Sequence, residues 1–155
     1  MNHLQPLTAL LAQTERQRDL ALADQMKAQT AADAAQAQAE QLMAYRRDYE
    51  QRWNAQFTRS GSIELVRCYQ GFVERLSQAV DQQTRAARQA NAALECAIQT
   101  VREREVQVAA VKKLVERRMA EGRAAAQRHE QREADEVAAR VAWANRAARD
   151  RTKAV

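Results

Sequence analysis

The scarcity of residues that interrupt helices is the feature that most constrains this chain. Its 155 residues include three glycines and one proline. Pro6 stands where proline is tolerated, in the first turn of a helix, and nothing from Leu7 to Phe57 breaks a helix. The one cluster of turn-forming residues is TRSGS at 58–62. We therefore predict two long helices, about 4–58 and about 63–148, joined by a tight turn at 59–62.

The glycines differ in their expected roles. Gly61 is expected to take the left-handed conformation that ends the first helix, and Ser62 is expected to cap the second. Gly71 and Gly122 fall inside the second helix, where a single glycine costs about 1 kcal/mol relative to alanine and is tolerated.

Composition and periodicity both indicate a coiled coil. Ala, Glu, Lys, Leu and Arg make up 83 of the 155 residues, and aromatic residues make up 5%. This composition is typical of long helices and argues against a compact fold with an enclosed pocket. Apolar residues recur every seven positions, as in a coiled-coil seam. In the second helix they are Val66, Val73, Val80, Ala87, Leu94, Val101, Val108 and Val115. In the first helix the series is Leu7, Thr14, Ala21, Ala28, Ala35, Leu42 and Tyr49.

A short turn makes the two helices antiparallel, so the fold class is all-α: an antiparallel coiled-coil hairpin in one domain over residues 1–155. Facing residues should have numbers that add up to about 121, given a turn centred near residue 60 or 61. Tyr49 should then lie level with Phe72, and Tyr45 with Leu76. Ala28, Ala32 and Ala35 should lie opposite Ala93, Gln89 and Ala86. From about residue 118 the second helix has no partner and overhangs.

The sequence offers little for catalysis, and we predict no enzyme, no catalytic residues, no metal site and no cofactor. His129 and Glu133 have a spacing that suits a metal, but two ligands make a poor site. No glycine-rich phosphate loop is present. Cys68 and Cys96 are 28 residues apart without metal-ligand spacing, and Cys68 is interpreted as a small packed residue.

Charge and hydropathy bear on partners and location. The net charge is +5, and the basic excess accumulates toward the C-terminus, where it is interleaved with acidic residues. Arms that bind nucleic acid usually have cleaner basic runs, so a basic coiled coil binding nucleic acid is only an alternative. No signal peptide is recognised, and no segment approaches the roughly 20 apolar residues that cross a bilayer. The chain is predicted to be cytoplasmic.

A second apolar stripe lies beside the seam. It runs through Leu65, Tyr69, Phe72, Leu76, Ala79 and Gln83 in the second helix and through Gln38, Leu42, Tyr45 and Tyr49 in the first. The stripe is either a widened core that compensates for the thin alanine section or an exposed patch that binds a partner. The pattern leaves both interpretations open.

Several segments of the chain resemble one protein family. They are YRRDY at 45–49, YQGF at 69–72, Leu76, DQQ at 81–83 and EQREADE at 130–136. With them the chain resembles FliJ, a small coiled-coil component of the bacterial flagellar type III export apparatus, over nearly its whole length.

The resemblance implies a function and partners. FliJ proteins form a hairpin similar to the central shaft of rotary ATPases. They promote assembly and activity of the hexameric export ATPase FliI, connect it to the export-gate membrane protein FlhA and help recycle export chaperones. The resemblance implies no nucleic-acid partner and no direct membrane insertion. It implies a cytoplasmic location, peripherally associated with the inner membrane at the flagellar base. The related stalk component of virulence-type secretion systems is a further alternative.

The resemblance also implies two binding surfaces. The gate-binding patch would comprise Gln38, Leu42, Tyr45, Tyr49, Phe72, Leu76, Ala79 and Gln83, with Gln83 standing where some relatives have histidine. The overhang that binds the ATPase ring would present Arg128, Glu130, Gln131, Arg132, Asp135 and Glu136.

Overall fold

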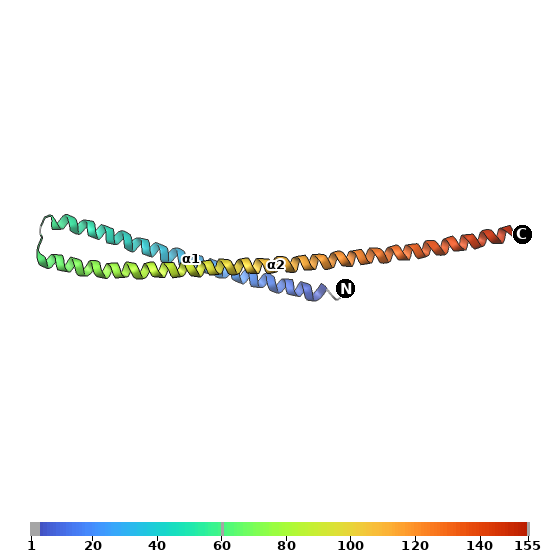
Figure 1. Ribbon diagram of the computed structural model, residues 1–155, viewed down its shortest axis with the longest axis horizontal. Helices are drawn as coiled ribbons and strands as arrows, with labels where there is room; N and C mark the ends of the chain where they lie inside the picture. Colours follow the sequence, from blue (N-terminus) through green and yellow to red (C-terminus); the bar gives the residue numbers. More distant parts are fainter. Residues whose placement is uncertain (1–3, 60, 155) are drawn as a thin grey trace. The chain divides into compact units, whose positions relative to one another are not determined.

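A computed structural model describes residues 4–59 and 61–154 of the chain. Its two helices are α1 (Leu4–Phe57) and α2 (Ile63–Lys153). They pack against each other as a hairpin, and α2 is the longer (Figure 1). The prediction of an all-α hairpin with a longer second helix is confirmed. Ser60, part of the predicted turn, lies outside the described residues.

The chain divides into two compact units, which are described in turn. One comprises residues 14–107, and the other comprises residues 1–13 together with 108–155. A single domain over residues 1–155 stays a prediction.

Hydrogen bonds at the turn end α1 and begin α2. The Thr58 hydroxyl donates to the carbonyl of Ala55 at 2.7 Å, and the Arg59 amide donates to the carbonyl of Gln56 at 3.1 Å. These bonds tighten the last turn of α1 and satisfy carbonyls that the helix leaves open. Ser62 caps α2 as expected, because its hydroxyl oxygen accepts from the Leu65 amide at 3.4 Å.

The expected role of Gly61 is wrong. No described glycine has a positive φ, so Gly61 does not take the left-handed conformation. The bonds made by Thr58 and Arg59 already close the end of α1, and no left-handed residue is needed there.

In the unit of residues 14–107, the two heptad series form the core between the helices. Every described member of both series in this unit is buried or half-buried. Pairs in contact have numbers that add up to 121, as predicted: Tyr49 with Phe72, Gln38 with Gln83, and Gln17 with Arg104. The antiparallel register is therefore the one that the turn position indicates.

The first helix contributes a second series that the sequence analysis missed. It runs through Arg18, Gln25, Ala32, Ala39, Arg46 and Trp53, all buried or half-buried. Ala32 and Ala39, at 2% and 1% exposed, are its most enclosed members. The series is hard to recognise because three of its six members are polar, and long polar side chains can pack their aliphatic stems while their polar ends stay in water.

The predicted pairing of alanines is wrong in its details. Ala32 is buried, but Ala86, Gln89 and Ala93 are exposed. The small residue that α2 buries in this region is Ala87, which belongs to the heptad series. The predicted residues of α2 lie on a different face of the helix, rotated away from the seam.

In the other unit, the start of α1 packs with the middle of α2. Val108 and Val115 are buried, and Leu4, Leu7 and Leu11 are half-buried. From Glu116 to Arg146 every residue of α2 is exposed. Within this unit, Leu4 of α1 lines a groove with residues of α2 as far as Ala126, and the end of α2 continues without a neighbouring described segment (Figure 1). We call residues 116–153 the tail.

Candidate interaction surfaces

Six aromatic side chains form a continuous cluster on the two helices next to the turn. Tyr49 is at its centre, with ring centroids 4.4 Å from Phe72, 5.9 Å from Tyr69, 5.9 Å from Trp53 and 6.3 Å from Tyr45. Phe57 completes the cluster through contacts with Trp53 and Tyr69. Four of these rings, Tyr45, Tyr49, Tyr69 and Phe72, belong to the second apolar stripe of the sequence.

Trp53 and Phe57 belong to the cluster and were missed. The available signal was their spacing: Trp53 follows Tyr49 by four residues, and Phe57 follows Trp53 by four. Residues four apart share one face of a helix. The phenol of Tyr69, which contacts both rings, has a raised pKa. Burial is the main cause, and the negative charge of Glu50 and the neighbouring Tyr49 add to it.

The predicted gate-binding patch combines core and surface residues. Leu76 is buried at 8% exposed, and Leu42, Tyr49, Phe72, Ala79 and Gln83 are half-buried. Tyr45 is 52% exposed, and Gln38 is also exposed. The second stripe is therefore divided: Leu76 belongs to the core, and Tyr45 lies at the surface.

Four members of the patch line an open groove between α1 and α2. They are Gln38, Leu42, Tyr45 and Gln83, and Gln41 completes the lining. The Gln83 side-chain amide crosses between the helices and donates to Oε1 of Gln38 at 3.0 Å. An amide pair beside a tyrosine offers both hydrogen bonding and apolar contact, which is the combination common in protein interfaces.

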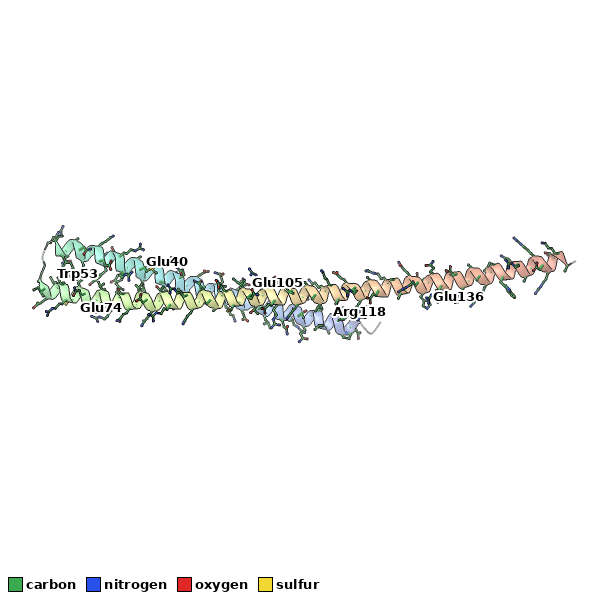
Figure 2. All side chains as sticks on the ribbon, viewed as in Figure 1. Glu40, Trp53, Glu74, Glu105, Arg118 and Glu136 are labelled. Atoms are coloured by element: carbon green, nitrogen blue, oxygen red, sulfur yellow. The ribbon has the colours of Figure 1, made fainter. Side chains whose placement is uncertain are left out.

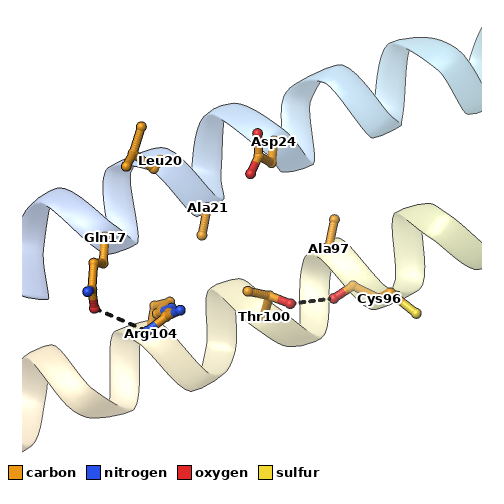
Figure 3. Close-up of a pocket in the computed structure, with 8 residues that line it drawn as sticks. All are labelled: Gln17, Leu20, Ala21, Asp24, Cys96, Ala97, Thr100 and Arg104. Atoms are coloured by element: carbon orange, nitrogen blue, oxygen red, sulfur yellow. Dashed lines mark hydrogen bonds between the residues drawn. The ribbon is translucent and has the colours of Figure 1, made fainter.

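A second groove lies farther from the turn in the same unit and was not predicted. Figure 3 shows Leu20 and Asp24 of α1 above Cys96 and Thr100 of α2. Arg104 occupies a seam position here and donates to Oε1 of Gln17 at 3.1 Å. This bond lets the hairpin keep a guanidinium at its seam, since a partly buried polar group needs a partner.

The predicted ring-binding residues all lie on the tail, and all are exposed. Arg128, Arg132 and Glu136 project from one face, together with His129 and Glu133. Figure 2 shows the tail with side chains projecting along its length, Glu136 among them. The His129 Nδ1 lies 3.4 Å from Glu133 Oε1, and Arg140 lies 4.0 Å from Glu136. These exposed pairs add little stability, so the charges stay available to a partner.

The described residues contain no group of three His, Cys, Asp or Glu side chains that could hold a metal ion. Cys68 and Cys96 are both free and exposed, so the interpretation of Cys68 as a packed residue is wrong. The wide aromatic rings fill the interface at this level, and Cys68 lies outside it. Neither helix, over the residues described, has a stretch that is long and apolar enough to cross a membrane.

These features define a class of protein: an antiparallel coiled-coil hairpin with an aromatic cluster near its turn, surface grooves along its seam and an exposed charged tail. The chain matches the family model described as flagellar FliJ protein over residues 3–147. It belongs to the FliJ family and is a component of the flagellar export apparatus, in a family that is structural and not enzymatic. No curated protein sequence and no solved structure matches the chain.

Proposed function

We propose that this protein acts as a central stalk of the flagellar export machinery. It promotes assembly and activity of the hexameric export ATPase, links that ATPase to the export gate and helps recycle export chaperones. It works at the flagellar base on the cytoplasmic side of the inner membrane. Family membership supports the flagellar role over the virulence-type alternative.

The observation that carries the proposal is the exposed tail. A helix that is polar all round lacks the tertiary packing that supplies most helical stability. All residues from Glu116 to Arg146 are exposed, and side chains of both signs project from them. A ring of subunits around the tail would supply the missing packing. Arg128, Arg132, Asp135 and Glu136 would then meet the loops that line the ring.

The test is the hydrolysis rate of the cognate export ATPase. We expect the full chain to stimulate hydrolysis, and a chain ending at Arg118 to lose the stimulation. A double variant, Arg128→Glu with Arg132→Glu, keeps the helix and reverses two charges, so it should also lose most of the stimulation. Arg88→Glu is the matched control, since Arg88 is exposed on α2 outside the tail. Equal stimulation by all four proteins would refute the stalk function.

The groove beside the aromatic cluster is proposed as the surface that binds the export gate. Tyr45 and Gln38 are its accessible members, with Leu76 supporting them from the core. An exposed tyrosine next to a paired amide is a suitable anchor, since tyrosine is among the residues that dominate binding energy at interfaces.

The gate interaction is tested by binding of the soluble part of the gate protein. Tyr45→Ser should weaken binding about tenfold or more, which corresponds to at least ~1.4 kcal/mol. Leu20→Ser is the control, because Leu20 is 67% exposed on the same helix and lies in the other groove. Circular dichroism should show equal helicity for both variants. If Leu20→Ser weakens binding as much as Tyr45→Ser does, the assignment of the groove is wrong.

A further inference from the structure

The tail carries an apolar stripe with coiled-coil spacing that no described residue covers. The stripe consists of Ala134, Val137, Val141, Ala144 and Ala148, at alternating intervals of three and four residues. Val137 and Val141 are 57% and 55% exposed, and the three alanines are exposed as well. This spacing is that of the a and d positions of a coiled coil.

The stripe is not a continuation of the hairpin seam. The seven-residue series of Val108 and Val115 would continue through Gly122, His129 and Glu136, which are not a coiled-coil core. The apolar residues of the tail therefore lie in a different phase on the helix. A seam with its own phase is suited to a separate helical partner.

Charge is segregated along the same segment. Residues 130–139 contain four acidic side chains and one basic, whereas residues 140–153 contain five basic and one acidic. Within residues 130–153 the structure forms one ion pair between two of these charges, Glu136 with Arg140 at 4.0 Å. The segment is therefore an acidic half followed by a basic half, with most charges left for an external partner.

We propose that the tail pairs with the tail of a second copy of this chain, in antiparallel orientation through the stripe. Antiparallel pairing places the acidic half of each copy against the basic half of the other. Parallel pairing would set like charges against each other and is disfavoured. A pair of this kind is two-fold symmetric, so each complementary contact occurs twice.

Charges beside the stripe fit this pairing. Glu133 and Arg151 are 18 residues apart, or five turns of helix, and so lie on the same side of the stripe. Pairing about residue 142, one residue from the middle of the stripe, brings Glu133 of one copy level with Arg151 of the other. Because the stripe consists mostly of alanine, the interface is small and the association weak, with a dissociation constant on the order of 100 µM.

The test is sedimentation equilibrium of the full chain, with charge-reversed variants. The wild-type chain should self-associate at low salt and dissociate in about 0.5 M NaCl, where exposed charges are screened. The variant Glu133→Lys with Glu136→Lys should stay monomeric, and so should Arg149→Glu with Arg151→Glu. An equimolar mixture of the two variants should restore association, because each then offers the charge that the other lacks.

The rescue by mixing distinguishes the proposal from misfolding, and circular dichroism of each variant provides a second check. Three results would overturn the proposal: a wild-type chain that stays monomeric at several hundred micromolar, variants that associate alone as the wild type does, or a mixture that does not associate. Association that survives truncation after Arg118 would also overturn it, since the tail would then not carry the interface.

Discussion

Tyr49 makes more aromatic contacts than any other residue described. Its ring meets those of Tyr45, Trp53, Tyr69 and Phe72, which come from both helices. Aromatic pairs at such distances contribute about 0.5–1.5 kcal/mol each beyond the area they bury. Most of the buried core residues are alanine and valine, so the rings of the cluster, half-buried except for the exposed Tyr45, are the large side chains that pack between the helices next to the turn.

Replacing Tyr49 with alanine should therefore lower the free energy of unfolding by about 2–4 kcal/mol, as cavity-forming aromatic substitutions do. Urea denaturation followed by circular dichroism measures the change. Trp143→Ala is the matched control, because Trp143 is 75% exposed and makes no ring contact with the residues described, and its effect should stay within about 0.5 kcal/mol. Similar losses for both variants would show that the cluster is not a core.

The raised pKa of Tyr69 has a consequence at alkaline pH. Burial, Glu50 and Tyr49 disfavour the phenolate in the folded protein, so the unfolded chain releases this proton at lower pH. Stability should therefore fall as pH rises through the ordinary tyrosine pKa of about 10. Tyr69→Phe should reduce that alkaline loss, as measured by melting temperature between about pH 8 and pH 11. An identical alkaline loss in the variant would contradict the assignment.

At the residue scale, the sequence predicted the pairing of Tyr49 with Phe72, because register follows from the turn position. The seven-residue spacing places Arg104 at the seam, but it did not predict the polar members of the second series of α1. Arg46 stands at a position that a hydropathy pattern assigns to solvent, and only the packed helices show that it lies along the seam. Arg104 depends on Gln17, a residue 87 positions away in the chain.

At the scale of elements, α1 ends where hydrogen bonds of the turn replace the regular backbone hydrogen bonds of the helix. This helix end does not require a glycine. Gly61 has no positive φ, and a Cβ there would lie 3.7 Å from the carbonyl oxygen of Phe57, an ordinary contact. Gly71 is helical, and a Cβ there would meet nothing within 4 Å.

Gly71→Ala should therefore stabilise the hairpin by about 0.5–1 kcal/mol, since alanine is the better helix former. Gly61→Ala should be neutral or stabilising by a few tenths, because it restricts the unfolded chain without straining the fold. Thermal melting measures both effects. A loss of stability in Gly71→Ala would mean that the helix packs more closely at this position than the structure indicates.

The seven-residue pattern predicted both helices and the face that α2 buries. It assigned the alanines in the middle of the hairpin to the wrong face of the helix. Alanines occur all round both helices in that section, so apolar residues are not concentrated on one face. The first helix illustrates the general reason: its most enclosed residues, Ala32 and Ala39, are small, and burial of a small residue leaves little trace in hydropathy.

At the scale of the whole molecule, the buried side chains of residues 4–59 and 61–154 all lie at or before Val115. Truncation after Arg118 should therefore leave the cooperative unfolding of the hairpin unchanged within about 0.5 kcal/mol, while far-UV circular dichroism loses the signal of the removed helix. Calorimetry of the two proteins tests this expectation. A large fall in the melting temperature of the truncated chain would show that the tail packs on the hairpin.

The central claim is that the tail is the surface that binds the export ATPase. Hydrogen exchange, measured by mass spectrometry with and without the ATPase at concentrations below those of self-association, tests it most directly. Exposed single helices exchange quickly, so the tail should exchange fast alone and slow several-fold with the ATPase present, while residues 14–107 stay unchanged. Protection confined to residues 14–107, with a tail that continues to exchange fast, would contradict the claim.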